Sequence, residues 1–226
     1  MAPGPLVVKL QRLIERTYDL HTGLGDLGPY IIGDEGYARF FEGRPVAQKV
    51  GAAAPAGAKT LLRDSGDGLR VCVYYPDRMV ENLERLDPAR CLSDDNVDDF
   101  ATLIEELDHF LFIADRHRSD ATMSLLELEL HANVTKSLVL ELFVARIRRR
   151  DRLTEPDRDW IQHHLFDKNE FREDDPDVEE RYRNASALAV RYLRFFRSLP
   201  VGDRPAELRR FHRRSHHEKL AHIARI

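Results

Sequence analysis

Apolar residues recur with helical spacing through two consecutive segments, 97–111 and 123–150, and this pattern restricts the fold more than any other feature. In the first segment they form a single stripe that would cover one face of a helix. In the second, residues 138–144 are apolar on nearly every side, which is typical of a helix buried on most sides. The stripe of the first segment consists of Val97, Phe100, Ile104, Leu107 and Leu111. Two long adjacent core helices therefore predict a helical bundle.

A β-hairpin is predicted shortly before these helices. Leu69, Val71 and Val73 alternate with other residues at the period of a half-buried strand. A shorter strand-like run at 60–63 precedes them, and the intervening DSGDG contains the glycines of a hairpin loop. Because a lone hairpin is only marginally stable in water, it must pack on helices or gain another strand. The predicted fold class is mainly α (α+β), a helical bundle core with a small β-hairpin inserted before the long core helices.

Capping and turn residues mark the ends of the other predicted elements. Ser93 is the predicted N-cap of the first long helix, because aspartates that favour a helix N-terminus follow it. Thr154 is predicted to open a later helix. Residues 43–58, rich in Gly, Ala and Pro, are predicted to form a loop or linker. Further helices are predicted over 6–22, in the second half of 30–41, over 174–198 and in the C-terminal tail.

The length of 226 residues suits one domain. We expect a single domain over 1–226, with a mixed helix and hairpin portion at 1–90, a helical core at 91–200 and a basic helical tail at 201–226. Apolar residues make up 42% and charged residues 33%, which is ordinary for a soluble protein. No apolar run approaches the roughly 20 residues that span a bilayer, and no signal-peptide core is visible, so no membrane association is expected.

The cysteine content indicates the compartment. Cys72 and Cys91 are the only cysteines, too few for a disulfide framework, so a reducing cytoplasm is expected. Arginine outnumbers lysine 29 to 6, which we interpret as GC-rich coding and hence a bacterial origin.

Charge is segregated along the chain although the net charge is only −4. Residues 91–115 contain eight acidic residues and no Lys or Arg. Residues 204–226 contain seven Lys or Arg, two Glu and four His. Alternating blocks of opposite sign favour contacts between proteins or between copies of one chain.

Two pairs of glutamate and histidine are the clearest candidates for chemistry. Glu105 and Glu106 precede His109 by four and three residues, and Glu127 precedes His131 by four. Side chains at these spacings are neighbours on a helix surface. Glu127 and His131 share a stripe with apolar residues, so they are expected at or inside the core boundary. Glu105 and His109 lie opposite the main apolar stripe, which predicts a solvated or interface face for them.

Our leading hypothesis for function is a non-catalytic cytoplasmic protein-interaction or assembly subunit, self-associating or bound to a protein partner, with no cofactor. It rests on the charge segregation and on the lack of a complete catalytic motif. The third hypothesis, nucleic-acid binding through the Arg146–Arg152 and Arg204–Arg225 clusters, is less favoured because a domain-wide positive bias is missing.

The alternative is a metal-dependent hydrolase with zinc, iron or manganese. Its ligands would be Glu105, Glu106, His109, Glu127 and His131, and Glu129 would act as the catalytic base. The segment from Glu106 to His109 has the Glu-x-x-His spacing of di-iron and di-manganese helix bundles, but no second such motif follows. No motif in the chain identifies a family. One shared ion would require the His109 and His131 rings to lie within about 5 Å of each other.

Overall fold

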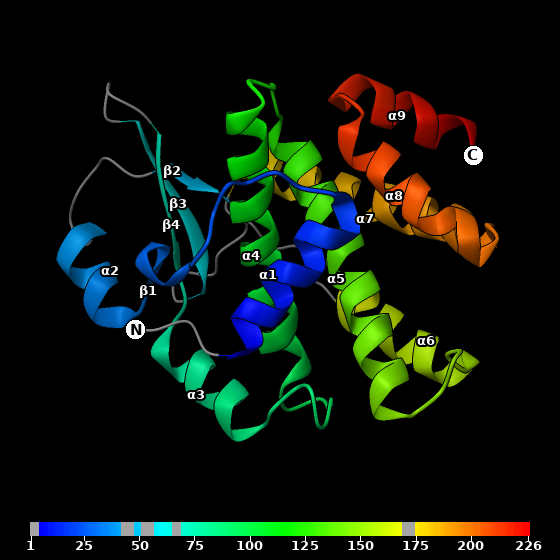
Figure 1. The fold of residues 1–226 in the computed structure, drawn as a ribbon, viewed down its shortest axis with the longest axis horizontal. Helices are drawn as coiled ribbons and strands as arrows, with labels where there is room; N and C mark the ends of the chain where they lie inside the picture. Colours follow the sequence, from blue (N-terminus) through cyan, green and yellow to red (C-terminus); the bar gives the residue numbers. More distant parts are fainter. Residues whose placement is uncertain (1–4, 42–47, 51–56, 65–68, 169–174) are drawn as a thin grey trace.

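The computed structural model describes residues 5–41, 48–50, 57–64, 69–168 and 175–226. Its core is a stack of three long helices, in which α5 (Leu125–Ile147) lies between α4 (Val97–Arg118) and α7 (Pro176–Ser198) (Figure 1). The predicted stripe on α4 is buried throughout. The predicted mainly α fold class and helical core are therefore confirmed. The helices pack together because the periodic apolar pattern gives each of them a face that is stabilised by burial.

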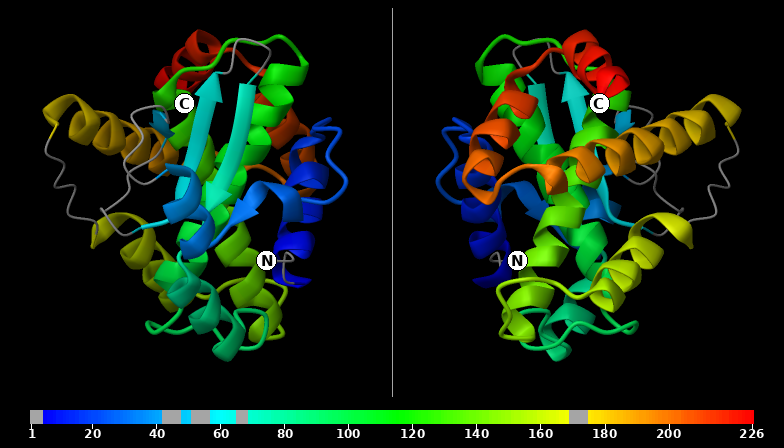
Figure 2. Two further views of the ribbon diagram at one scale, coloured as in Figure 1. Left: turned by 90° about the vertical axis from the view of Figure 1, so that its left-hand side faces the viewer. Right: turned by 90° about the vertical axis from the view of Figure 1, so that its right-hand side faces the viewer.

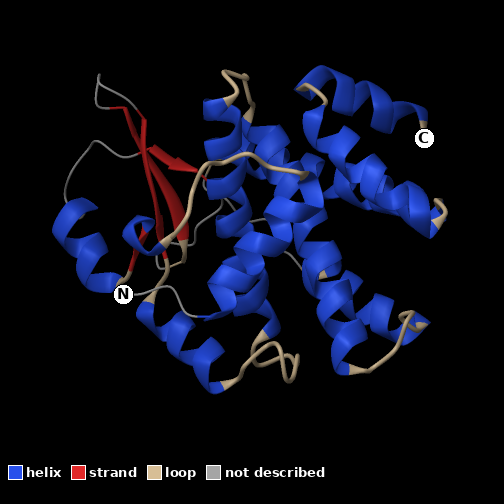
Figure 3. Cartoon of the chain, in the orientation of Figure 1, coloured by secondary structure: helices blue, strands red, loops and turns tan. Residues whose placement is uncertain are grey.

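A small sheet covers the other side of α4, and it contains the predicted hairpin (Figure 3). Strands β3 (Lys59–Asp64) and β4 (Leu69–Tyr74) pair antiparallel, with Thr60 opposite Val73. The hairpin gains one strand on each edge, which gives the order β1-β4-β3-β2. Strand β1 (Ile31–Ile32) runs parallel to β4, and β2 (Gln48–Val50) runs antiparallel to β3.

The predicted loop at 43–58 is wrong in part. Residues 48–50 form the edge strand β2, although their sequence has only a weak preference for the β conformation. They are held there because the edge of β3 offers backbone hydrogen-bond partners. Residues 43–47 and 51–56 lie outside the described residues, as does the hairpin loop at 65–68. Helix α2 (Asp34–Phe41) lies on the face of the sheet opposite α4, where the Tyr37 ring stacks on Tyr74 (Figure 1).

Local capping sets where most helices begin. The Ser124 hydroxyl caps α5, and Thr154 forms a capping box with Asp157 at the start of α6 (Glu155–Gln162). The predicted cap at Ser93 is wrong, because α4 begins at Val97 with Asn96 at the N-cap position. The Asn96 side chain bonds three backbone groups of the preceding loop, which holds residues 93–96 in turns before the helix starts.

The remaining elements surround the core. Helix α1 (Pro5–Tyr18) packs against α4 and α8, and α3 (Asp77–Arg85) packs against α4. The predicted basic tail forms two helices, α8 (Arg204–Arg213) and α9 (His216–Arg225), joined by a capping box at Ser215. Short elements complete the chain: η1 (Gly28–Tyr30), the π-helix η2 (His163–Asp167) and η3 (Val201–Asp203). No helix among the described residues is long and apolar enough to cross a bilayer.

Truncation of a core side chain on α4 tests this packing. Leu111 is completely buried, so Leu111→Ala is expected to lower the free energy of unfolding by roughly 2–5 kcal/mol through lost burial and a residual cavity. Leu125→Ala is the matched control, because Leu125 is 44% exposed and its truncation is expected to cost less than about 1 kcal/mol. Urea denaturation measures both; equal losses would contradict the assigned core.

Candidate metal centre

The contact between α4 and α5 buries an unusual number of charged side chains. Burying a charge is costly unless it is paired, hydrogen-bonded or bound to a metal. The buried set on α4 is Glu106, Asp108, His109 and Arg116, and the set on α5 is Glu127, Glu129, His131 and Lys136. These residues separate into three groups, of which the first is the candidate metal centre.

We call Glu105, Glu106, His109 and Glu129 the His109 cluster. The His109 ring has no solvent exposure, and neither of its nitrogens has a hydrogen-bond partner among the described residues. Its Nδ1 atom lies 3.6 Å from Glu106 Oε2, and its Nε2 atom lies 3.6 Å from Glu129 Oε2. Both separations are too long for hydrogen bonds. A buried imidazole therefore faces one carboxylate on each side without bonding to either.

Glu105 completes the cluster and is its most exposed member. One ligand atom from each of Glu105, His109 and Glu129 can be chosen so that all three lie within 4.8 Å of one another. Glu105 also accepts a hydrogen bond of 2.7 Å from Lys136 Nζ, and its side chain is 22% exposed. The cluster therefore comes nearest to solvent at Glu105.

Opposing charges outweigh burial at two members of the cluster. Burial acts to lower the pKa of His109, but the Glu129 and Glu106 carboxylates hold it well above 6.5. Burial acts to raise the pKa of Glu105, but the Lys136 ammonium outweighs it and lowers that pKa. At Glu106 burial prevails and the pKa is raised. Without a metal, the negative charge of the carboxylates in the cluster is balanced by the imidazolium of His109 and the ammonium of Lys136.

Residues outside the cluster fix its orientation. The Thr60 hydroxyl on β3 donates a 2.7 Å hydrogen bond to Glu106 Oε2, the same oxygen that faces His109. On the opposite side, α7 contributes Tyr182, whose pKa is raised by burial and then by the charge of Glu129. The sheet and α7 therefore enclose the cluster from both sides.

The predicted solvated face of α4 is wrong for His109, which is buried beneath the sheet and α5. Helix α4 is covered on two sides, so residues opposite its main apolar stripe also enter the interior. The candidate ligands separate accordingly: Glu105, Glu106 and His109 lie in the cluster, and Glu129, predicted as the base, joins them. Glu127 and His131 are buried, as expected, but belong to other groups.

Glu127 lies in an ion cluster that attaches the C-terminal helices. Its Oε1 atom accepts hydrogen bonds from Arg116 Nη2 at 2.9 Å and from Lys219 Nζ. Both cations also donate to the backbone carbonyl of His212. One buried carboxylate therefore joins α5 to α4 and α9. Lys219 of the basic tail is therefore paired with an acidic residue of the same chain.

His131 belongs to a chain of hydrogen bonds that crosses the interior. Its Nδ1 atom lies 2.8 Å from Asp108 Oδ2, and its Nε2 atom lies 3.2 Å from His212 Nδ1. His212 Nε2 lies 2.9 Å from Asp115 Oδ2. Asp108 Oδ1 accepts from Thr135 at 2.8 Å, so the Tyr18 hydroxyl, 2.9 Å from Thr135, must donate to it. We call these six residues the histidine chain.

Hydrogen counting defines the charge of the histidine chain. The three contacts that join Asp108, His131, His212 and Asp115 need three hydrogens. If both carboxylates are ionised, the two imidazoles carry all three and share one positive charge. Burial lowers the pKa of His212 to about 4, although its hydrogen bond to Asp115 acts to raise it. Burial opposes ionisation of Asp115, but hydrogen bonds from His212 and His21 lower its pKa.

The histidine chain connects two cavities. Asp115 and His212 line one of about 430 Å³, and Thr135 and Tyr18 border another of about 50 Å³ on the far side. The arrangement also attaches α1, α4, α5 and α8 to one another.

Several of these residues have no local signal in the sequence. His212 lies 81 positions from His131, and Lys219 lies 92 positions from Glu127. Asp108 stands beside His109, and Asp108 and Asp115 share a helix face at a spacing of seven, but nothing local identifies their partners. Comparison of the chain with protein-family models, with curated proteins and with solved structures gives no match. Geometry alone therefore supports the assignment of the site.

Removal of Glu127 tests the ion cluster. Glu127→Ala leaves the buried Arg116 and Lys219 charges without a carboxylate and is expected to lower the free energy of unfolding by about 3–5 kcal/mol. Glu84→Ala, at an exposed position on α3, is the control and should change stability by less than about 0.5 kcal/mol. Urea denaturation at neutral pH compares them, and a loss below about 1 kcal/mol for Glu127→Ala would contradict the proposed pairing.

The lowered pKa of His212 predicts a pH dependence of stability. Between pH 6.5 and about 4 the unfolded chain binds a proton at this ring and the folded chain does not. The free energy of unfolding should therefore fall as the pH falls through this window, by at most about 1.4 kcal/mol per pH unit from this group. His212→Asn should reduce the slope and His117→Asn, at an exposed position, should not. Urea unfolding at several pH values measures it; identical slopes for His212→Asn and wild type would refute this assignment.

Proposed function

We propose that this protein binds one divalent transition-metal ion at the His109 cluster, with Glu105, His109 and Glu129 as ligands. The observation that carries the proposal is the buried His109 ring, whose nitrogens face carboxylates without bonding to them. Such a group costs stability as an unpaired donor or acceptor. A metal ion between the ring and the carboxylates would remove that cost.

The spacing of the cluster supports this proposal. Ligand bonds of about 2.1 Å at tetrahedral angles place neighbouring ligand atoms roughly 3.4 Å apart. The 3.6 Å separation between His109 Nε2 and Glu129 Oε2 is close to that value. Only small side-chain movements would be needed for both atoms to coordinate one ion.

The second nitrogen of His109 has a partner suited to a metal ligand. Histidines that bind metals usually donate their other ring N–H to a carboxylate, which fixes the ring and raises its basicity. Glu106, held by Thr60, lies on that side. We therefore assign Glu106 to orienting His109 rather than to ligation.

The donor set points to zinc, iron or manganese. Imidazole nitrogen and carboxylate oxygen together suit these ions. Copper(I) prefers sulfur ligands, and calcium prefers six or more oxygen ligands; the cluster provides neither set. Coordination at Nε2 replaces the second proton of His109, so binding of the ion should release about one proton.

The enclosure of the cluster bears on what the ion does. Structural metal sites are closed, whereas catalytic sites keep an open coordination position. Only Glu105 is substantially exposed here, and Glu129 is better placed as a ligand than as a base. These features favour a firmly held ion over the hydrolase alternative, in which Glu127 and His131 would also be ligands.

Metal analysis of the purified protein tests the proposal. After equilibration with zinc, iron(II) or manganese(II) and removal of free ions, we expect one ion per chain for at least one metal. Glu129→Gln and His109→Ala should lower the bound metal at least tenfold, because each removes a ligand. His117→Ala, on the exposed side of the same helix, is the matched control and should bind normally.

A folding check accompanies these measurements. Glu129→Gln is nearly isosteric, and circular dichroism should show that it keeps the helical content of the wild type. Bound metal should raise the thermal unfolding temperature of the wild type and leave that of Glu129→Gln unchanged. A wild-type protein that binds none of the three ions, or a Glu129→Gln protein that binds them equally well, would overturn the assignment.

A further inference from the structure

A cavity of about 460 Å³ lies between α1, the segment that joins α3 to α4, and the end of α5. We call it the α1 cavity. Lys9, Arg12 and Arg16 of α1 and Arg146 of α5 line it, and none of the described residues in its lining is acidic. Figure 2 shows the start of α1, the segment between α3 and α4 and the end of α5 at the same end of the molecule in both views. Elements far apart in the sequence therefore place positive charge around one space.

The spacing of the basic residues places them along one side of α1. Lys9, Arg12 and Arg16 are separated by three and four positions, so they follow one face of the helix. Leu10 and Leu13 line the same cavity, and Leu10 has no solvent exposure. A basic row on α1 therefore borders an apolar row that faces the interior.

The floor of the α1 cavity is apolar. Leu10 and Phe143 of the lining are buried, and Leu6 and Leu13 are partly buried. Phe143 and Arg146 are three positions apart on α5, so the ring and the guanidinium group lie on the same side of that helix. Sites for small molecules commonly have volumes of roughly 300–1,000 Å³ and combine an apolar lining with a few polar groups. The α1 cavity has both properties.

The four cations of the α1 cavity have no counterion in the described part of the chain. None of them forms an ion pair or a side-chain hydrogen bond there. Asp87, close to the cavity in sequence, accepts from the Ala89 backbone and pairs with Arg90. Glu15 on α1 accepts hydrogen bonds from two other side chains. A cleft lined by charges of one sign concentrates its electrostatic potential and attracts ions of the opposite sign.

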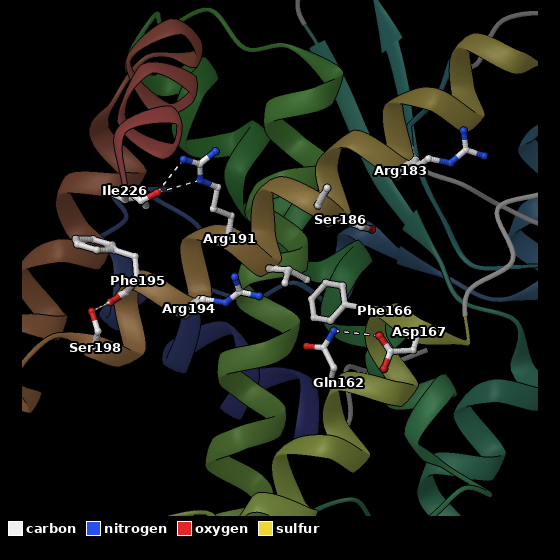
Figure 4. A pocket seen from close by; sticks show the side chains of 12 residues that line it. Gln162, Phe166, Asp167, Arg183, Ser186, Arg191, Arg194, Phe195, Ser198 and Ile226 are labelled. Carbon is white, nitrogen blue, oxygen red and sulfur yellow. Dashed lines mark hydrogen bonds between the residues drawn. The ribbon is translucent and has the colours of Figure 1, made fainter.

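The larger groove beside α7 differs in this respect. It measures about 870 Å³ and is bordered by three arginines of α7, but Asp167 also lines it (Figure 4). Arg191 there bonds the backbone oxygens of Ala224 and Ile226, and Arg183 is paired within α7. The chain itself therefore offsets part of the positive charge of that groove, whereas the charge around the α1 cavity is not offset.

We propose that the α1 cavity binds a small, soluble phosphate monoester that has an apolar part. Guanidinium groups match phosphate oxygens with paired, charge-assisted hydrogen bonds. A phosphate monoester carries about 1.5 to 2 negative charges at neutral pH, so it balances more of the four cations than a carboxylate does. The apolar part of the ligand would cover the apolar floor, while the phosphate group would lie among the arginines.

A membrane surface is a poorer occupant of this site. A helix that binds a bilayer needs its apolar face free to enter the lipid. The apolar face of α1 is packed inside the protein, where Leu10 and Ile14 are 0% and 1% exposed. A bilayer could therefore reach only the charged rim of the cavity, whereas a small ligand can reach both the rim and the floor.

Calorimetric titration with octyl phosphate tests the proposal. Below the concentration at which this probe forms micelles, one molecule should bind per chain, with an affinity that falls as salt is added. Octanoate has less charge and methyl phosphate lacks the apolar chain, so each should bind at least tenfold more weakly. Arg12→Ala and Arg146→Ala should each weaken binding of octyl phosphate about tenfold, because each removes a charged hydrogen-bond donor.

Matched controls separate the α1 cavity from positive charge in general. Arg225→Ala removes an exposed arginine of α9 that does not line the cavity, and it should leave the affinity unchanged. Glu129→Gln should also bind octyl phosphate normally, because Glu129 lies 17 positions before Arg146 on α5, or about 25 Å along the helix. Thermal unfolding should show that each variant remains folded.

Three results would overturn the proposal. The first is a wild type that does not bind octyl phosphate, including one that binds only vesicles of phosphatidylcholine and phosphatidic acid. The second is a wild type that binds octanoate or methyl phosphate as tightly as octyl phosphate. The third is full affinity for octyl phosphate in both Arg12→Ala and Arg146→Ala.

Discussion

Burial of charge between α4 and α5 is the constraint on which the rest of this structure depends. A long helix that is covered on two sides cannot keep every polar residue at the surface, and α4 places glutamates and a histidine inside the protein. Each buried charge is costly unless a partner offsets it. The arrangement of the surrounding elements follows from where those partners are found.

The partners come from distant parts of the sequence. Thr60 on the sheet bonds Glu106, and Tyr18 on α1 joins the histidine chain through Thr135. Lys219 on α9 reaches Glu127. The same contacts that satisfy the buried groups therefore also position the sheet, the first helix and the C-terminal helices around the α4–α5 pair. Among the described residues, His109 is the histidine that has both ring nitrogens buried without a hydrogen-bond partner, which is why metal binding is proposed there.

Much of this fold can be predicted from periodicity, since the long helices and the hairpin each have a regular apolar pattern. Strand β2 could not be predicted, because pairing with the edge of β3 is a tertiary effect. The buried position of His109 was also missed, since a helix covered on two sides has no single polar face. Local sequence predicts glutamate and histidine neighbours on one helix, but partners such as His212 depend on how distant helices pack.

The position of Lys219 has a consequence for biosynthesis. Glu127 obtains its second cation only from a helix that leaves the ribosome about ninety residues later, as the sequence separation of 92 implies. A nascent chain that has completed α5 therefore carries an acidic group whose final environment does not yet exist. Close docking of α4 on α5 should therefore be delayed until α9 has also been synthesised.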